Sequence, residues 1–329
     1  MSITRNAHSL LRRLLLHLSV SHSLDSIMTS TSLSVPWSSP FLPSRSGHAL
    51  PIHFPFAFSS PHTPSHSPLH SSLKFGRREN LQQPSLVASV MDQATPFELR
   101  DRDDFEKLVS PDGLISISGF GSLLSERSAR STFPDLINFR VGRLNGFRRV
   151  FAHVAPIFFE RGIAKPETKE ISSLSVEPCQ GERLIVTVFE IKKSEIPAFI
   201  ERELEFRFLA VVPETLDGKP FDCPAVVCAR YSDEEFFQIR CKGSQEIYNQ
   251  QYGRYNIDRI WRDDILPCRA YLRHCVLAAK NLSDAAYDNF LDHTFLADRK
   301  TTIGQYLATT GCGIMKEEPP ESLKTRYGG

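Results

Sequence analysis

Alternation of apolar and polar residues predicts a series of short strands in the middle of the chain. Residues 114–118 (Leu-Ile-Ser-Ile-Ser) alternate with period two and end at Gly119, as a strand does where it enters a turn. Short connections between the strands favour antiparallel pairing. The other predicted strands are two within residues 141–151, broken near Asn145-Gly146, and two hairpins, which join 174–176 to 184–189 and 208–212 to 225–229.

Helical periodicity replaces the alternation after Ser232. Residues 232–240 begin with a serine N-cap and carry acids in the first turn, and residues 269–280 and 283–296 predict two longer helices. Strands followed by helices are typical of an α+β protein. We therefore predict a small, mixed and mainly antiparallel β-barrel with helices packed outside it.

The first ninety residues show neither period. They contain 21 of the serines and 8 of the 11 histidines, and seven basic residues stand against only two acids, Asp25 and Glu79. A segment of this kind buries too little apolar surface to offset its ordering entropy. We expect a disordered leader at 1–90, a linker at 91–113, a folded domain at 114–310 and a flexible tail at 311–329.

A basic, serine-rich and acid-poor leader is typical of an organellar transit peptide. The leucine-rich run at residues 10–16 contains Arg12 and Arg13, so it is too short and too basic to span a bilayer. The serine and proline content favours a chloroplast over a mitochondrion, and residues 87–90 form a candidate processing region. An ordinary disordered tail is the alternative. A secretory signal is disfavoured because no small-residue cleavage site follows the apolar run.

Cysteine, histidine and charge exclude several classes of protein. Seven cysteines occur without a Cys-x-x-Cys pair, which indicates a reducing compartment rather than a disulfide framework. Only three histidines follow residue 90, at spacings that match no zinc signature. The folded part lacks a long basic run. We expect no metal, no cofactor, no nucleic-acid partner and no membrane insertion, and the oligomeric state stays open.

The turn at residues 119–124 (Gly-Phe-Gly-Ser-Leu-Leu) is the first candidate for chemistry. Two glycines after a strand allow a sharp bend or the close approach of a ligand to the backbone. Successive N–H groups in such a turn form a concave nest that suits a carboxylate or a phosphate. A simple strand-to-helix turn is the alternative, and Gly-x-Gly does not by itself decide between them.

Glu203 is the second candidate. Residues 194–204 predict a helix capped by Ser194, in which Glu203 lies four residues after Phe199 and three after Ile200. This spacing places its carboxylate on the apolar face, where desolvation raises a pKa toward the range of a general acid/base. The alternative is a carboxylate at the edge of that face, paired with Arg202 or Arg207.

Three segments together resemble the γ-glutamylcyclotransferase-like family. The 119–123 turn is similar to its Tyr-Gly-Ser-Asn/Leu loop, and residues 142–151 are similar to the Arg-x-x-Gly-Trp/Phe-Arg-Arg-x-Phe strand of its ChaC-like branch. The hairpin at 173–189 occupies the place of a family strand pair, and Arg202-Glu203 falls where the family carries its catalytic glutamate. The match in order and spacing covers about residues 114–212.

The resemblance implies an activity. In the family, the loop holds the α-carboxylate of a γ-glutamyl group and the glutamate transfers protons while the α-amine attacks the γ-carbonyl, which releases 5-oxoproline without a metal or cofactor. The implied partner is a small γ-glutamyl peptide or amine, glutathione among them. Glu203 would be the acid/base, and the implied substrate-binding residues are Phe120, Gly121, Ser122, Leu123 and Tyr271, the last by similarity to a late family tyrosine.

Two departures from the family keep an alternative open. Phe120 replaces the usual tyrosine and lacks its hydroxyl, and residues 204–208 (Leu-Glu-Phe-Arg-Phe) replace a Gly-Gly-Tyr stretch that follows the glutamate. The alternative function is a non-catalytic protein that keeps the pocket for binding a small molecule or for regulation.

Overall fold

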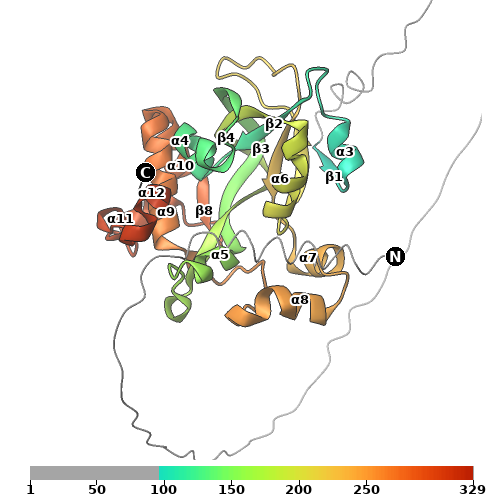
Figure 1. Cartoon of the computed structure of the whole chain (residues 1–329). Coiled ribbons are helices and arrows are strands. Elements are labelled where there is room, and N and C mark those ends of the chain that lie inside the picture. The colour runs from blue at the N-terminus through green and yellow to red at the C-terminus, as the bar shows by residue number, and fades with distance from the viewer. Residues whose placement is uncertain (1–95, 329) are drawn as a thin grey trace, which may run out of the picture. The chain divides into compact units, whose positions relative to one another are not determined.

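The computed structural model describes residues 96–328, so the predicted leader at 1–90 lies outside the described residues. This part of the chain is an α+β structure built on one eight-stranded sheet in the order β1-β5-β6-β2-β4-β3-β8, with β7 beside β4 (Figure 1). The strands are β1 (Phe97–Leu99), β2 (Leu114–Gly119), β3 (Ile137–Val154), β4 (Glu170–Lys192), β5 (Arg207–Val211), β6 (Ala225–Ala229), β7 (Leu266–Pro267) and β8 (Thr294–Leu296).

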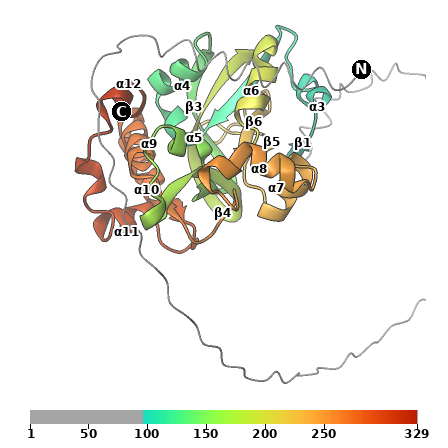
Figure 2. The same ribbon diagram turned by 60° about the horizontal axis from the view of Figure 1, so that its bottom comes forward.

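Helices cover both sides of the long β3–β4 pair, with α9 to α12 on one side and α3, α6, α7 and α8 on the other (Figures 1 and 2). Within residues 96–328, no helix is both long and apolar enough to cross a membrane. The helices are α3 (Arg102–Glu106), α4 (Glu126–Thr132), α5 (Pro156–Glu160), α6 (Ile196–Arg202), α7 (Asp233–Arg240), α8 (Gln245–Tyr252), α9 (Arg269–Leu282), α10 (Asp284–Asp292), α11 (Ile303–Ala308) and α12 (Lys324–Tyr327). The 3₁₀ turns are η1 (Ser122–Leu124), η2 (Pro166–Thr168), η3 (Lys193–Glu195), η4 (Gly253–Tyr255), η5 (Ile314–Lys316) and η6 (Glu321–Leu323).

The sheet is mainly antiparallel, as predicted, but it is open, so the prediction of a closed barrel is wrong. The edge strands β1 and β8 do not pair with each other in the described part of the chain. β8 pairs only with β3 there, and α10 and α11 pack beside it. Helices rather than another strand therefore cover that edge.

The two long central strands also differ from the prediction. β3 and β4 pair antiparallel along almost their whole length, from Ile137↔Glu190 to Val154↔Ser172. The predicted break near Gly146 and the predicted hairpin turn at 178–182 are bulges that face each other, since Asn145 pairs with Arg183 and Phe147 with Pro178. Each predicted pair of strands is thus one bent strand.

Other boundaries follow the prediction with smaller changes. The β5–β6 hairpin and the capping of α7 by Ser232 are confirmed. The helix predicted at 283–296 ends at Asp292, and Thr294 begins β8. The predicted linker at 91–113 contains β1 and α3, and the predicted tail at 311–329 contains η5, η6 and α12, where Tyr327 is buried.

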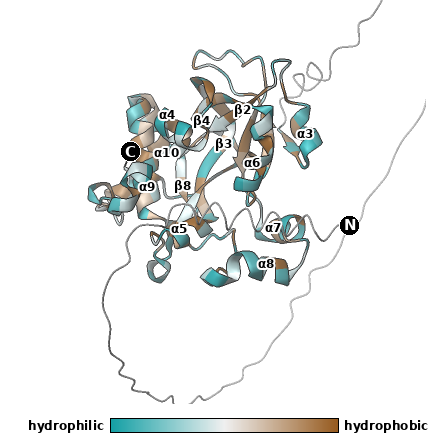
Figure 3. Cartoon of the chain, viewed as in Figure 1, coloured by the Kyte–Doolittle hydropathy of each residue, from teal (hydrophilic) through white to brown (hydrophobic). Residues whose placement is uncertain are grey.

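One apolar cluster lies between the sheet and α6. Ile115 and Ile117 of β2 pack with Phe189 of β4 and with Ile196 and Phe199, the buried residues of α6. α6 has an apolar side and a polar side (Figure 3). The residues between these on β2 and β4 face the other way, where Val186 and Val188 join a second cluster. Both faces of the sheet are therefore packed, which fixes the position of the turn that ends β2.

Candidate active site

The turn that follows β2 is held by its own glycine and by β4. A Cβ atom at Gly119 would stand 2.7 Å from both the Leu123 Cβ and the Thr187 Oγ1, so no larger residue fits there without a shift. The Thr187 hydroxyl donates a hydrogen bond to the Leu123 carbonyl at 2.9 Å. The chain can therefore fold back from β2 directly into η1.

Two backbone donors of this turn are unused. Among the described residues, the N–H groups of Gly121 and Leu123 donate no hydrogen bond to the protein. The N–H of Ser122 lies between them, beside the Cys275 sulfur, and the N–H of Leu124 donates to the Gly121 carbonyl at 3.0 Å. Unused neighbouring amides at the start of a helical turn are suited to an anion.

Arg149 holds the turn from behind. Its side chain is fully buried in β3, and its Nε donates to the Phe120 carbonyl at 2.7 Å. Its other nitrogens donate to the Ile185 carbonyl and, at 3.1 Å, to Asn289 Oδ1. Burial lowers the pKa of this guanidinium to about 9. No carboxylate of the described residues pairs with it, so a buried positive charge stands directly behind the turn.

The hydrogen bond from Arg149 sets the direction of the Gly121 donor. The C=O of Phe120 and the N–H of Gly121 belong to one trans peptide, in which the two groups point in opposite directions. Because the C=O turns toward the buried guanidinium, the N–H must turn away from it. The arginine thus fixes a donor that a ligand can reach from the other side.

Tyr271, in the first turn of α9, reaches the same turn. Its hydroxyl would stand 3.4 Å from a Cβ at Gly121, and it lies beside Ser122 and Cys275. Burial, with a smaller contribution from Cys275, raises the pKa of this phenol well above its usual range. A neutral hydroxyl therefore lies beside the turn, where Phe120 offers none.

Glu203 lies just beyond α6 rather than within it. The helix ends at Arg202, and Glu203 is its C-cap, whose N–H donates to the Phe199 carbonyl at 3.0 Å. Its side chain is 27% exposed and pairs with Arg202 Nε at 3.1 Å. The alternative of an edge carboxylate paired with Arg202 describes this arrangement better than a place on the apolar helix face.

Glu203 and the turn nevertheless lie at the same end of the sheet. β2 and β6 run parallel with Ser116 opposite Ala225, and continuing this register puts Gly119 level with Cys228. Burial raises the pKa of the Cys228 thiol well above its usual range, and the charge of Glu203 raises it further, so Glu203 lies near Cys228. Neighbouring strands are about 4.8 Å apart. No hydrogen bond within residues 96–328 joins the Glu203 carboxylate to the turn.

The residues after Glu203 are packed into the interior. Phe206 is buried, with its ring centroid 4.7 Å from that of His153 and 5.5 Å from that of Trp261. Phe208 is buried against Phe105, with ring centroids 5.2 Å apart. Aromatic rings thus fill space that glycines would leave open.

The structure therefore groups most of the predicted site and adds to it. Gly121, Ser122 and Tyr271 meet at one place, Phe120 and Leu123 contribute backbone there, and Glu203, in the connection between α6 and β5, lies at the same end of the sheet. The sequence did not assign Arg149 to the site, although its side chain is buried while that of the adjacent Arg148 is partly exposed. The place of Arg149 on the strand gave no sign of the three acceptors that it binds, because they belong to other segments of the chain.

Metal ligands do not gather in the part of the chain that the structure describes. No group of three or more His, Cys, Asp or Glu side chains there could hold a metal ion. All seven cysteines are free thiols.

Part of this chain is similar in structure to solved proteins, whereas its sequence matches no known family. No protein family and no curated protein matches the sequence. A solved γ-glutamyl cyclotransferase is 18% identical and covers 47% of this chain and 89% of its own, with a TM-score of 0.29. The uncharacterized protein loc79017 from Homo sapiens has the same identity and coverage and a TM-score of 0.30. YkqA from Bacillus subtilis is 16% identical over 47% of this chain and 56% of its own, with a TM-score of 0.25.

Proposed function

We propose that this protein is an enzyme that cyclises the γ-glutamyl group of a small peptide or amine and releases 5-oxoproline. The observation that carries the proposal is the pair of unused N–H donors at Gly121 and Leu123, with the buried Arg149 cation behind them. A γ-glutamyl group presents an α-carboxylate that both donors and the cation favour. Glutathione is one substrate of this class.

The proposed reaction is intramolecular. The substrate reacts as the neutral α-amine, its ammonium having released one proton to solvent, and the Glu203 carboxylate takes a second proton from this nitrogen as it attacks the γ-carbonyl carbon. A C–N bond closes the five-membered ring, the bond to the leaving nitrogen breaks, and Glu203 returns the proton to that nitrogen. Holding the substrate folded supplies much of the acceleration in such a step. For this role, the Glu203 side chain must leave Arg202 and turn toward the end of β2.

In the proposed reaction, Tyr271 is a hydrogen-bond donor to the substrate. Its neutral hydroxyl, beside Gly121 and Ser122, would donate a hydrogen bond to the substrate's carboxylate or carbonyl. It would thereby supply the hydroxyl that Phe120 lacks, from α9 rather than from the loop.

Glu203→Gln tests the catalytic assignment. We expect the full chain to release 5-oxoproline from at least one of a panel of γ-glutamyl peptides and amines. The variant should lower kcat/KM by about 10²- to 10⁴-fold, because the proton-transfer group is gone. The matched control is Glu201→Gln, at an exposed glutamate in the last turn of α6, which should stay within about twofold of wild type. Equal activity of wild type and Glu203→Gln would contradict the assignment.

A non-catalytic binding protein is the second candidate. Two observations favour it. The ion pair with Arg202 holds the Glu203 carboxylate, and the buried rings of Phe206 and Phe208 fill the space beside it. Calorimetric titration of the full chain with 5-oxoproline and glutathione separates the two candidates. Binding without turnover of any γ-glutamyl substrate supports the second candidate, and turnover excludes it.

We also propose that the protein is imported into the chloroplast stroma, with the mitochondrion as second choice. The support is the serine-rich, acid-poor composition of residues 1–90. A fluorescent protein fused after residue 90 should collect in chloroplasts of transfected plant cells. The same fusion without the leader should stay in the cytosol. A cytosolic or secreted signal from the first fusion would contradict the import proposal.

A further inference from the structure

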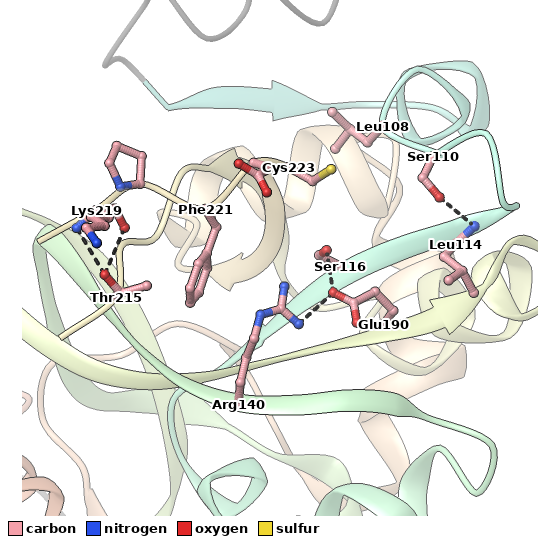
Figure 4. A pocket seen from close by; sticks show the side chains of 12 residues that line it. Leu108, Ser110, Leu114, Ser116, Arg140, Glu190, Thr215, Lys219, Phe221 and Cys223 are labelled. Atoms are coloured by element: carbon pink, nitrogen blue, oxygen red, sulfur yellow. Dashed lines mark hydrogen bonds and ion pairs between the residues drawn. The ribbon is translucent and has the colours of Figure 1, made fainter. Parts of the chain in front are cut away.

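A separate cavity opens at the other end of β2. It has a volume of about 420 Å³ and lies between the start of β2, the neighbouring β3 and β4 strands and the loop that joins β5 to β6 (Figure 4). This volume is in the usual range for small-molecule sites. It shares no lining residue with the turn at 119–124 or with Glu203, so an inference drawn from it is independent of the proposed function.

Glu190 contributes a carboxylate to the cavity, and one of its two oxygens has no hydrogen-bond donor among the described residues. Its side chain is only 12% exposed, and its Oε1 accepts a hydrogen bond from Ser116 Oγ at 3.2 Å and pairs with Arg140 Nη1 at 2.7 Å. Its Oε2 is buried and has no hydrogen-bond partner among the described residues. A buried carboxylate oxygen without a donor is unfavourable, so a rotation of the Glu190 side chain that turns this oxygen toward an ammonium in the cavity would stabilise it.

Arg140 supplies the opposite charge beside it. Its guanidinium carbon lies 4.8 Å from the centroid of the Phe221 ring, and its side chain is 35% exposed. The side chains of Arg140 and Glu190 point toward each other with Phe221 alongside (Figure 4). An exposed guanidinium held in this way can bind a carboxylate.

The charges of the side chains that line the cavity indicate which class of ligand it suits. Two basic side chains, Arg140 and Lys219, and two acidic ones, Glu190 and Asp222, line the cavity. A balanced lining does not favour a polyanion such as a nucleotide, and it suits a ligand that carries one charge of each sign. Leu108, Leu114, Pro220 and Phe221 provide apolar wall for the rest of such a ligand.

We propose that this cavity binds a small zwitterionic α-amino acid with an apolar side chain. Its ammonium would donate to Glu190, its carboxylate would pair with Arg140, and its side chain would pack against the leucines.

Calorimetric titration of the full chain tests the charge pattern. L-Leucine should bind saturably, whereas L-leucinamide, which lacks the carboxylate, and 4-methylpentanoate, which lacks the amine, should bind about tenfold more weakly or not at all. Glu190→Gln and Arg140→Met should each weaken leucine binding by about tenfold. The control Asp288→Asn, an exposed residue of α10 outside the lining, should leave it unchanged. Equal binding of the three ligands, or unchanged binding by Glu190→Gln, would overturn the proposal.

A second measurement needs no variant and so does not depend on the folding of one. Cys223 is an exposed thiol that lines the cavity, and Cys312 is an exposed thiol outside its lining. Bound leucine should slow alkylation of Cys223 by iodoacetamide while Cys312 reacts as before, which peptide mass spectrometry measures. No protection of Cys223 at about 10 mM leucine, or equal protection of both thiols, would also overturn the proposal.

Discussion

Arg149 is a buried cation whose described partners are all neutral acceptors. It satisfies two backbone carbonyls and one side-chain amide from three separate segments, which offsets part of the desolvation of its charge. The remaining charge is unbalanced within residues 96–328. An anion bound at the Gly121 amide would be the nearest partner able to balance it.

Arg149→Lys tests this role. A lysine keeps a charge but can reach fewer of the three acceptors, so the Phe120 peptide loses its fixed direction. We expect KM for a γ-glutamyl substrate to rise by about 10- to 100-fold with a smaller change in kcat, because the carboxylate contact weakens. Steady-state kinetics measure both constants. Arg148→Lys, whose half-buried arginine pairs with Glu177 instead, is the control and should leave KM unchanged. A folded Arg149→Lys variant with wild-type KM would refute the role.

Individual residues of the candidate site differ in how far the sequence could predict them. Gly121, Ser122 and Leu123 could be proposed from a local pattern because a strand followed by glycines is itself the signal. Arg149 could not be assigned, because its acceptors come from the turn after β2, from β4 and from α10, and no spacing along the chain relates them. Glu203 was proposed from helical spacing, but the helix ends one residue earlier and its geometry no longer applies.

At the scale of elements, α10 connects to the central strands through one side chain. Asn289 Oδ1 accepts from the Ile185 N–H at 2.8 Å and from Arg149, and its Nδ2 donates to the Arg183 carbonyl at 2.8 Å. The bulge of β4 ends just before these residues. The helix thus satisfies an N–H and a carbonyl of β4 beside the bulge.

Asn289→Ala should therefore destabilise the fold. It leaves an N–H and a carbonyl of β4 without their partner and removes an acceptor from Arg149. We expect the free energy of unfolding to fall by about 2–4 kcal/mol, measured by urea denaturation. Asp288→Asn, an exposed neighbour on the same helix, should change it by less than about 0.5 kcal/mol. A change of similar size in both variants would contradict this role of α10.

The long strands explain why part of the sheet could not be predicted. Pro178 and Gly181, which has φ of +88°, are residue types that occur both in hairpin turns and in bulges. Only pairing with β3, more than twenty residues earlier in the chain, decides that β4 continues through them. The β5–β6 hairpin was predictable because its strands pair with each other, across a short local loop.

At the scale of the whole molecule, two buried histidines connect stability to pH. Burial lowers the pKa of His153 to about 3, and burial together with Arg326, Arg273 and Arg127 lowers that of His274 to about 4. An unfolded chain has a histidine pKa of about 6.5. Both groups thus stay neutral in the folded protein while the unfolded chain takes up protons.

Stability should therefore be fully present above about pH 6.5 and should fall as the pH drops toward 4. Each histidine contributes a slope of up to about 1.4 kcal/mol per pH unit in this window. Urea denaturation from pH 7 to 4 measures the slope. His153→Gln should flatten it, whereas His293→Asn, at a partly exposed position, should not. An identical slope in wild type and His153→Gln would contradict the prediction.

The Arg149 hydrogen bond to Phe120 has a consequence for selectivity among anions. A donor whose direction is set before the ligand arrives loses little conformational freedom on binding, but it also cannot adapt to a different shape. The N–H group of Gly121 should then suit a planar carboxylate better than a tetrahedral phosphate or sulfate of greater charge. The shape of an anion would then affect its affinity for this turn more than the size of its charge.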